Sequence, residues 1–210
     1  MYMPPQFTAK NRADAAALVR EYSFASLISN DDDSVPFVTH LPLHLIENND
    51  DQDSWTLLGH CAKPNPHWRY LQARPKAVVT FMGPHAYMSP KVYPDLARVP
   101  TWNYLAVHCV VTARIIDEPA AKDALLKQLI GDHEPPYAQQ WRDLGGDFQL
   151  KMLSGIVAFE LKVDKMNCKL KLNQHRPEAQ ADMRKAYESG SDNEQALAAW
   201  MTRLGTGPAP

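Results

Sequence analysis

The sequence is poor in cysteine: its 210 residues include only Cys61, Cys109 and Cys168, and no Cys-x-x-Cys pair. An odd number of scattered thiols argues against a disulfide framework and against a zinc ribbon, which needs paired ligands at short spacing. Reduced thiols are typical of intracellular proteins, so we expect a cytoplasmic location.

An excess of charge of either sign is also missing. Lysine and arginine total 22 and aspartate and glutamate total 24, which gives a formal net charge of −2. Nucleic-acid-binding domains normally carry a basic surface, and no helix-turn-helix spacing with a basic second helix is present. The sequence therefore argues against direct DNA binding.

Long hydrophobic runs are absent as well. No stretch approaches the roughly 18 apolar residues that a membrane-spanning helix needs. The start of the chain, Met1 to Phe7, lacks the basic and then apolar pattern of a signal peptide. We expect no association with a membrane.

The common catalytic signatures are missing too. There is no G-x-G-x-x-G, P-loop, G-x-S-x-G or H-E-x-x-H motif. These absences argue against a dinucleotide fold, a nucleotide hydrolase, a serine hydrolase and a zinc protease. No nucleophile, general base or metal site stands out, so the catalytic residues are left unassigned.

The hydrophobic periodicity that is present predicts an α+β protein, mainly β, with antiparallel strands. Alternating βαβ units are absent, which argues against a doubly wound sheet. Two acidic stretches, 30–33 and 48–53, are typical of hairpin loops. The predicted strands are 24–29, 36–46, 54–60, 77–82, 102–116 and 155–172. The predicted helices are 12–21, 117–130, 137–144, 177–188 and 191–204.

One polar segment follows the strand that ends near His60. Asn65 is placed to cap a helix that begins at Pro66, and free backbone N–H groups at such a turn attract anions. Lys63 and His60 add donors beside it. This pattern indicates a phosphate site, and the alternative is a rigid proline turn with a structural histidine.

Two further segments, 81–90 and 99–104, place aromatic rings and small hydroxyl groups at strand edges. Such residues suit a flat aromatic ligand, and the alternative is core aromatics with turn prolines. In a fourth segment, 169–176, polar and basic side chains follow a strand. They are placed to meet an anion, or they form a solvated strand end.

Together these segments resemble the PaiB family of FMN-binding proteins, often named negative transcriptional regulators. The resemblance covers about residues 1–176 and rests on several motifs in one order. They are Met-Tyr-x-Pro-x-x-Phe at 1–7, His-Leu-Pro at 40–42, Gly-His-x-Ala-x-x-Asn-Pro-His-Trp at 59–68, Phe-x-Gly-Pro-His-Ala-Tyr-x-Ser-Pro at 81–90, Val-Pro-Thr-Trp-Asn-Tyr at 99–104, Gly-Ile-Val-Ala-Phe-Glu at 155–160 and Lys-Leu-x-Gln-x-Arg at 171–176.

The resemblance implies an antiparallel split β-barrel of about six strands with peripheral helices, of the flavin reductase and pyridoxamine-phosphate oxidase type. Residues 1–176 would form this FMN-binding domain, and 177–210 a helical extension packed on the barrel or on a dimer partner. The family implies a homodimer with FMN at the interface. Its flavin would carry a redox or regulatory role, and an FMN-dependent oxidoreductase is one form of it.

The resemblance also assigns site residues. His60, Lys63 and Asn65 would hold the phosphate end of FMN. The residues that would line the ribityl chain or the ring are Tyr87, Ser89, Thr101, Trp102 and Asn103. Those that would come from the same or the partner subunit are Lys171, Gln174 and Arg176.

The chain departs from the family pattern at a few positions. Lys63 stands where arginine is common, so the charge is kept without a bidentate fork. Lys91-Val92-Tyr93 replaces Ser-Trp-Tyr, which removes one aromatic surface. Two alternatives to a flavin role are left open. One is a transcriptional regulator without a DNA-binding helix of its own, and the other is a haem-binding or haem-degrading protein with His40, His60 or His85 as a ligand.

Overall fold

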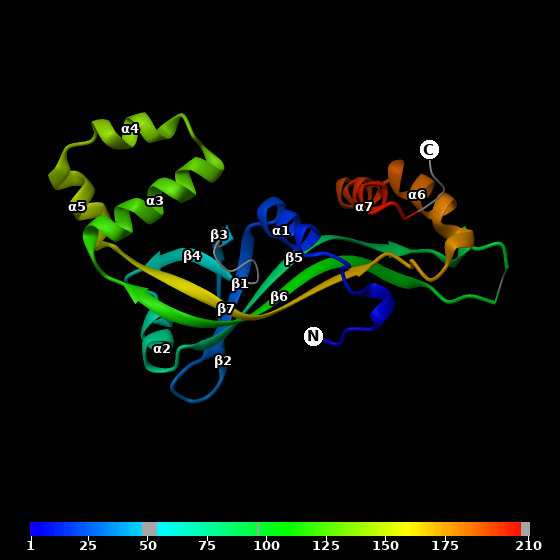
Figure 1. The fold of residues 1–210 in the computed structure, drawn as a ribbon, viewed down its shortest axis with the longest axis horizontal. Helices are drawn as coiled ribbons and strands as arrows, with labels where there is room; N and C mark the ends of the chain where they lie inside the picture. Colours follow the sequence, from blue (N-terminus) through cyan, green and yellow to red (C-terminus); the bar gives the residue numbers. More distant parts are fainter. Residues whose placement is uncertain (48–53, 96, 207–210) are drawn as a thin grey trace. The chain divides into compact units, whose positions relative to one another are not determined.

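The computed structural model describes residues 1–47, 54–95 and 97–206. In this part of the chain the strands form one seven-stranded sheet in the order β2-β1-β5-β6-β7-β4-β3 (Figure 1). β1 pairs antiparallel with β2 and with β5, and β4 pairs antiparallel with β3 and with β7. The sheet is open, with β2 and β3 at its edges. The predicted class, α+β and mainly β, is confirmed.

The observed elements follow the predicted order closely. No helix among the described residues has the length and apolarity needed to cross a membrane. The strands are β1 (Phe24–Asn30), β2 (Pro36–Pro42), β3 (His44–Glu47), β4 (Trp55–Ala62), β5 (Lys76–Met88), β6 (Thr101–Ile116) and β7 (Ile156–Lys171). The α-helices are α1 (Arg12–Glu21), α2 (His67–Ala73), α3 (Pro119–His133), α4 (Tyr137–Asp143), α5 (Gly146–Ser154), α6 (Gln180–Glu188) and α7 (Asp192–Arg203). Short 3₁₀ helices are η1 (Pro5–Phe7), η2 (Pro90–Val92) and η3 (Pro177–Ala179).

The chain divides into two compact units. Unit 1 comprises residues 1–21, 82–107 and 167–210, and unit 2 comprises residues 22–81 and 108–166. Strands β5, β6 and β7 each contribute residues to both units. The helices after residue 177 therefore share a unit with the N-terminal segment and with parts of three strands.

In unit 2, the stretch predicted as one strand over 36–46 is two strands. Leu43 separates them, and its N–H donates to the carbonyl of Ser23 at 3.0 Å. The chain changes partner at this point, since β2 pairs with β1 and β3 pairs with β4. This change of partner is why the count is seven strands and the prediction was about six.

The acidic stretch between β1 and β2 forms the predicted hairpin loop. The Asp31 carboxylate accepts the N–H groups of Asp33 at 3.0 Å and Val35 at 2.9 Å, which stabilises the turn. The second predicted acidic loop, 48–53, lies outside the described residues.

The interior of unit 2 is apolar and tightly filled around Gly59 of β4. A Cβ atom added at Gly59 would lie 2.5 Å from Leu43 Cδ2 and 3.2 Å from Phe159 Cε2. Only glycine leaves room for this approach, so the strand that leads into the 59–68 segment is pressed against the core.

The helices α3, α4 and α5 lie between the end of β6 and the start of β7 (Figure 1). Leu125 and Leu129 of α3 are buried, and Trp141 of α4 donates its Nε1 proton to Asp123 at 2.8 Å. Helix α5 was not predicted. Its large apolar residues Phe148 and Leu150 are about half exposed, so it shows no clear apolar face in the sequence.

In unit 1, strand β5 continues well beyond the predicted end at residue 82. Gly83 and Pro84 are consecutive buried residues within it, which interrupts the alternation in the manner of a bulge. The strand thereby reaches Tyr87 and Met88, so most of the predicted aromatic segment lies on β5.

The C-terminal helices α6 and α7 pack within unit 1. They bury Met183, Tyr187, Leu197 and Trp200, each at most 2% exposed. Ser191 and Glu194 form the predicted capping box at the start of α7. The helices therefore contribute large apolar side chains, which their polar sequence did not suggest.

Candidate functional site

The predicted site residues fall into two groups, one in each unit. His60, Lys63 and Asn65 belong to unit 2, and the other predicted residues belong to unit 1. Each group is described by itself below.

In unit 2, the polar segment connects β4 to α2. The Asn65 side chain accepts the N–H of His67 at 3.0 Å and donates its own amide to Thr39 Oγ1 at 3.1 Å. Asn65 was predicted to cap a helix beginning at Pro66, but α2 begins at His67 and its N-cap residue is Pro66, so Asn65 lies one position before the cap. With both ends of its amide bonded inside the protein, Asn65 stabilises the turn.

His67 is the buried centre of this segment, and the sequence did not single it out as a site residue. Its Nε2 lies 3.0 Å from Ser29 Oγ and its Nδ1 lies 2.7 Å from Thr39 Oγ1. The side chain is 1% exposed, and burial lowers the pKa of His67 to about 4. A neutral imidazole therefore links β1, β2 and α2.

His60 and Lys63 are the two residues of this group that keep unused polar groups. His60 Nδ1 is buried without a hydrogen-bond partner among the described residues, and burial lowers the pKa of His60. Lys63 is exposed, and its backbone carbonyl accepts the indole proton of Trp68 at 3.0 Å. Burial raises the pKa of the neighbouring Cys61 thiol to about 11, so Cys61 is no nucleophile at neutral pH.

In unit 1, three rings are exposed at the ends of β5 and β6. Tyr87 and Trp102 are 51% and 50% exposed, and their ring centroids lie 6.4 Å apart. His85 lies 6.0 Å from Trp102, and its Nδ1 accepts the indole proton at 3.4 Å. These rings form an accessible aromatic surface. Ser89, nearby in the sequence, caps η2 by accepting the N–H of Lys91 at 3.3 Å.

Three predicted residues of unit 1, Thr101, Lys171 and Arg176, line one pocket of about 310 Å³. Lys171 Nζ donates to Thr101 Oγ1 at 2.5 Å and to the Trp102 carbonyl at 2.6 Å. Arg98 and His175 line the same pocket, and sequence reasoning did not select them. No carboxylate lines this pocket among the described residues, so we call it the basic pocket.

The cationic side chains around the basic pocket lower one another's pKa values. Burial lowers the pKa of Lys171, and the charge of Lys169 lowers it further. Burial also lowers the pKa of His175, as do Arg176 and Lys171, although Glu178 acts in the opposite direction. Cations that disfavour one another's charge in this way favour an anionic ligand.

Arg98 adds a guanidinium group to the basic pocket. It contacts Asp95 at 2.8 Å and Glu178 at 3.8 Å, and it lies 5.5 Å from the ring centroid of Tyr93. Its Nε is buried without a partner among the described residues. The sequence offered one indication that Arg98 belongs to this site, because it directly precedes the Val-Pro-Thr-Trp-Asn-Tyr segment.

Two predicted residues of unit 1 form side-chain hydrogen bonds within the protein. Asn103 is fully buried, and its amide donates to Tyr187 Oη at 3.0 Å. Gln174 accepts the N–H of Leu172 at 2.9 Å and donates to the carbonyl of Leu170. Their amides stabilise the ends of β6 and β7, and a role of either residue at a ligand stays a prediction.

His40, one of the histidines considered as a haem ligand, lies on β2 and contacts residues of the neighbouring strand β1. Its Nδ1 lies 3.0 Å from Ser26 Oγ, and its ring stacks with Phe24 at a centroid distance of 6.4 Å.

Comparison with known proteins identifies the family. A family model described as "Putative FMN-binding domain" matches residues 1–165. The chain is 33% identical over 206 residues to the "Protease synthase and sporulation protein PAI 2" of Bacillus subtilis strain 168, which covers 97% of this chain and 96% of that protein. The chain belongs to the PaiB family. The predicted family is thereby confirmed, and the likeness extends past residue 176 into the C-terminal helices.

Solved structures show the same fold as this PaiB-family member at low sequence identity. The flavocytochrome Anf3 from Azotobacter vinelandii matches with a TM-score of 0.63 at 15% identity, over 80% of this chain and 70% of that one. The FAD and haem binding protein from Mycobacterium smegmatis matches with a TM-score of 0.58 at 18% identity, over 78% and 73% of the two chains. At these identities the likeness concerns the fold.

Proposed function

We propose that this protein binds FMN, and that the redox state of the flavin serves either a reaction or a regulatory response. The observation that carries the proposal is the basic pocket, which Thr101, Lys171 and Arg176 line. The exposed rings of Tyr87 and Trp102 belong to the same unit. A flat anionic cofactor needs both features, an aromatic surface and cations.

The residues fit FMN by their chemistry. Flavin supplies the electron-accepting chemistry, and the protein supplies binding and orientation. Lys171 and Arg176 would attract the anionic parts, and Trp102 would cover part of the ring. In unit 2, the proposed contacts to the phosphate end are His60, through its unpaired Nδ1, and Lys63, through its exposed ammonium group. Asn65 would act by holding the turn.

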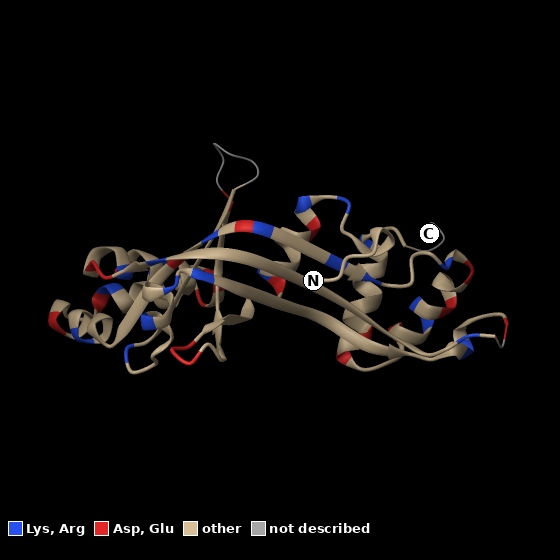
Figure 2. Ribbon diagram, turned by 90° about the horizontal axis from the view of Figure 1, so that it is seen from below, with Lys and Arg blue, Asp and Glu red and all other residues tan. Residues whose placement is uncertain are grey.

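We further propose a cytoplasmic homodimer with FMN at the subunit interface. In such a dimer the two groups of residues need not come from the same copy of the chain. Tyr87 and Trp102 support an interface because large aromatic side chains that are half exposed are enriched where proteins meet ligands or partners. Acidic and basic side chains are interspersed along the described chain (Figure 2), which does not favour direct DNA binding.

The test begins with an absorbance spectrum of the freshly purified protein, followed by titration with FMN. We expect the two visible bands of flavin, or saturable quenching of FMN fluorescence, and light scattering that reports a dimer. Trp102→Ala should weaken FMN binding about tenfold, and Phe148→Ala, at a half-exposed ring of α5, is the matched control. Absence of flavin together with absence of FMN binding would reject the proposal.

A second measurement separates turnover from regulation. With FMN bound, oxidation of NADH or NADPH under air is followed at saturating donor. Steady turnover supports an oxidoreductase. Binding without turnover, and without a gel shift on DNA at low salt, supports a flavin-dependent role exerted through other proteins.

A further inference from the structure

The aromatic surface of unit 1 depends on a local change in the alternation of β5. Along this strand the more exposed side chains are at even positions up to Met82 and at odd positions from His85. Two consecutive buried residues, Gly83 and Pro84, cause the change. A β-bulge shifts the alternation in this way and re-aims the side chains that follow it. With unbroken alternation, His85 and Tyr87 would face the interior.

The backbone at this bulge is packed against the core of unit 1. A Cβ atom added at Gly83 would lie 2.7 Å from Leu18 Cδ1 and 3.2 Å from Leu105 Cβ. Glycine therefore permits the close approach, and Pro84 adds a fixed φ angle. His85 consequently leaves the strand in a fixed direction, from a backbone that has little room to move.

The hydrogen bond between His85 and Trp102 determines where the imidazole proton lies. An indole N–H can only donate, and His85 Nδ1 is its acceptor at 3.4 Å. Nδ1 therefore carries no proton while this bond is formed, and the neutral ring carries its proton on Nε2. The His85 side chain is exposed, and its Nε2 forms no hydrogen bond within the described ranges.

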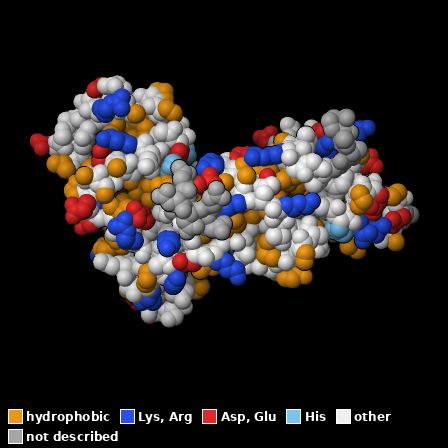
Figure 3. Space-filling model, in the orientation of Figure 1, with side chains coloured by type: hydrophobic (Ala, Val, Ile, Leu, Met, Phe, Trp, Pro, Cys, Tyr) orange, Lys and Arg blue, Asp and Glu red, His pale blue; other side chains and the backbone are white. Residues whose placement is uncertain are grey.

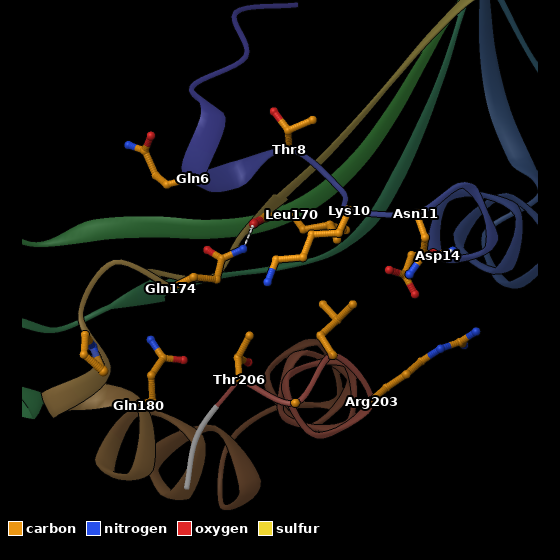
Figure 4. A pocket seen from close by; sticks show the side chains of 13 residues that line it. Gln6, Thr8, Lys10, Asn11, Asp14, Leu170, Gln174, Gln180, Arg203 and Thr206 are labelled. Atoms are coloured by element: carbon orange, nitrogen blue, oxygen red, sulfur yellow. Dashed lines mark hydrogen bonds between the residues drawn. The ribbon is translucent and has the colours of Figure 1, made fainter. Parts of the chain in front are cut away.

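Two predicted amides of unit 1, by contrast, donate inside the protein. Gln174, at a cavity of about 500 Å³, donates to the carbonyl of Leu170, which is the dashed line in Figure 4. Asn103 donates to Tyr187 Oη at 3.0 Å. His85 thus supplies the aromatic surface with a donor of known position that is accessible to a ligand.

We propose that His85 donates its Nε2 proton to the pyrimidine edge of the bound flavin, and that Trp102 fixes the tautomer that makes this possible. The inference rests on the proposed FMN binding. The pyrimidine edge of a flavin carries carbonyl and ring-nitrogen acceptors, and reduction increases the negative charge on them. A donor at this edge stabilises the reduced flavin more than the oxidised flavin, so His85 raises the reduction potential.

The same tautomer argues against His85 as a haem ligand. Iron binding through Nε2 needs that nitrogen without its proton, and metal-bound histidines normally donate their other ring N–H. In this protein the other nitrogen, Nδ1, accepts the indole proton of Trp102. Ligation would therefore break this bond, whereas donation to a flavin keeps it.

The first test needs no flavin. Long-range ¹H–¹⁵N spectra of the full-length protein at about pH 8, where histidine is ordinarily neutral, report which ring nitrogen carries the proton. We expect His85 to carry it on Nε2. Trp102→Phe keeps an aromatic ring but removes the indole N–H, so both tautomers should then be populated. A proton on Nδ1 in the parent protein would overturn the proposal.

The second test is the reduction potential of FMN bound to His85 variants, measured against a dye of known potential. His85→Leu should weaken binding of reduced FMN about tenfold relative to oxidised FMN, which lowers the two-electron potential by about 30 mV. His85→Gln should restore most of this loss, because its amide N–H can occupy the position of Nε2. His85→Asn should not, because its shorter amide reaches only the position of Nδ1.

His133→Leu is the matched control, because His133 is an exposed histidine of α3 outside the predicted site. It should leave the potential unchanged, and a thermal melt confirms that each variant folds. If the parent protein binds no FMN, the proposed function fails and the role of His85 fails with it. If FMN binds and His85→Leu matches His133→Leu, only this inference fails. Equal potentials in His85→Gln and His85→Asn would also overturn it.

Discussion

The two units use similar polar motifs in opposite ways. In unit 2, the amide of Asn65 and both ring nitrogens of His67 are consumed by bonds inside the protein. In unit 1, Lys171 and Arg176 line a pocket with Arg98. Buried polar atoms that lack partners in the described part of the chain occur in both units, at Arg98 and Gln180 in unit 1 and at His60 in unit 2. A dense polar motif can therefore either be bonded within the protein or line a pocket.

The two motifs differ in the course of the backbone that follows each of them. The segment after β4 turns straight into α2, so its side chains meet the β1–β2 hairpin and find partners there. The segment after β7 runs past the N-terminal segment and into η3, and pockets remain between these pieces. The face drawn in Figure 3 shows apolar side chains among charges of both signs, so no patch of one sign on that face reveals the site.

The largest effect on stability should come from removing the two hydrogen bonds of the buried His67 ring in unit 2. His67→Leu leaves the buried hydroxyl of Ser29 and the hydroxyl of Thr39 without their imidazole partner. We expect a loss of about 2–4 kcal/mol in the free energy of unfolding, measured by urea denaturation. The matched change in unit 1, His175→Leu at an exposed ring, should cost less than about 0.5 kcal/mol. Similar losses in both variants would remove the distinction between the units.

Acid should lower the free energy of unfolding through the same residue, His67. The pKa of His67 is about 4 in the folded protein and 6.5 when unperturbed, so the unfolded chain takes up its proton first. The stability from this group is fully present above pH 6.5 and is lost as the pH falls toward 4, by up to about 3 kcal/mol. Urea midpoints of the parent and of His67→Leu should therefore converge between pH 7 and pH 4.5. A constant gap between them would contradict the assignment.

The two lysines compare the units as binding surfaces. Lys171→Met removes a partly buried ammonium group from the basic pocket and should weaken FMN binding about tenfold. Lys63→Met removes an exposed one and should weaken it less than about threefold. FMN fluorescence titration measures both. The reverse order would place the dominant anion contact in unit 2.

The smallest effect concerns the anchoring of α6 in unit 1. Tyr187→Phe removes the hydroxyl that accepts the Asn103 amide at 3.0 Å. We expect a loss of about 1 kcal/mol in the free energy of unfolding. Tyr2→Phe, at a residue that is 82% exposed, should change it by no more than a few tenths of that. An unchanged free energy of unfolding in Tyr187→Phe would show that the bond between Asn103 and Tyr187 does not anchor α6.

The sequence alone predicted most of the secondary structure, because it depends on local periodicity and caps. Helix α1 spans the predicted residues, and the capping box at Ser191 and Glu194 starts α7 where expected. The family motifs also predicted a flavin-binding fold, since several segments in one order carry more information than any single pattern.

Other features depended on tertiary contacts that no local pattern encodes. The break at Leu43 arises because β2 and β3 pair with different strands, and the strand through Gly83 and Pro84 is held by burial rather than by propensity. The use of each polar residue was likewise decided by its neighbours in space. Asn65 and Asn103 look equally suited to a ligand in the sequence, and in the structure the side-chain N–H groups of both donate to residues more than 20 positions away.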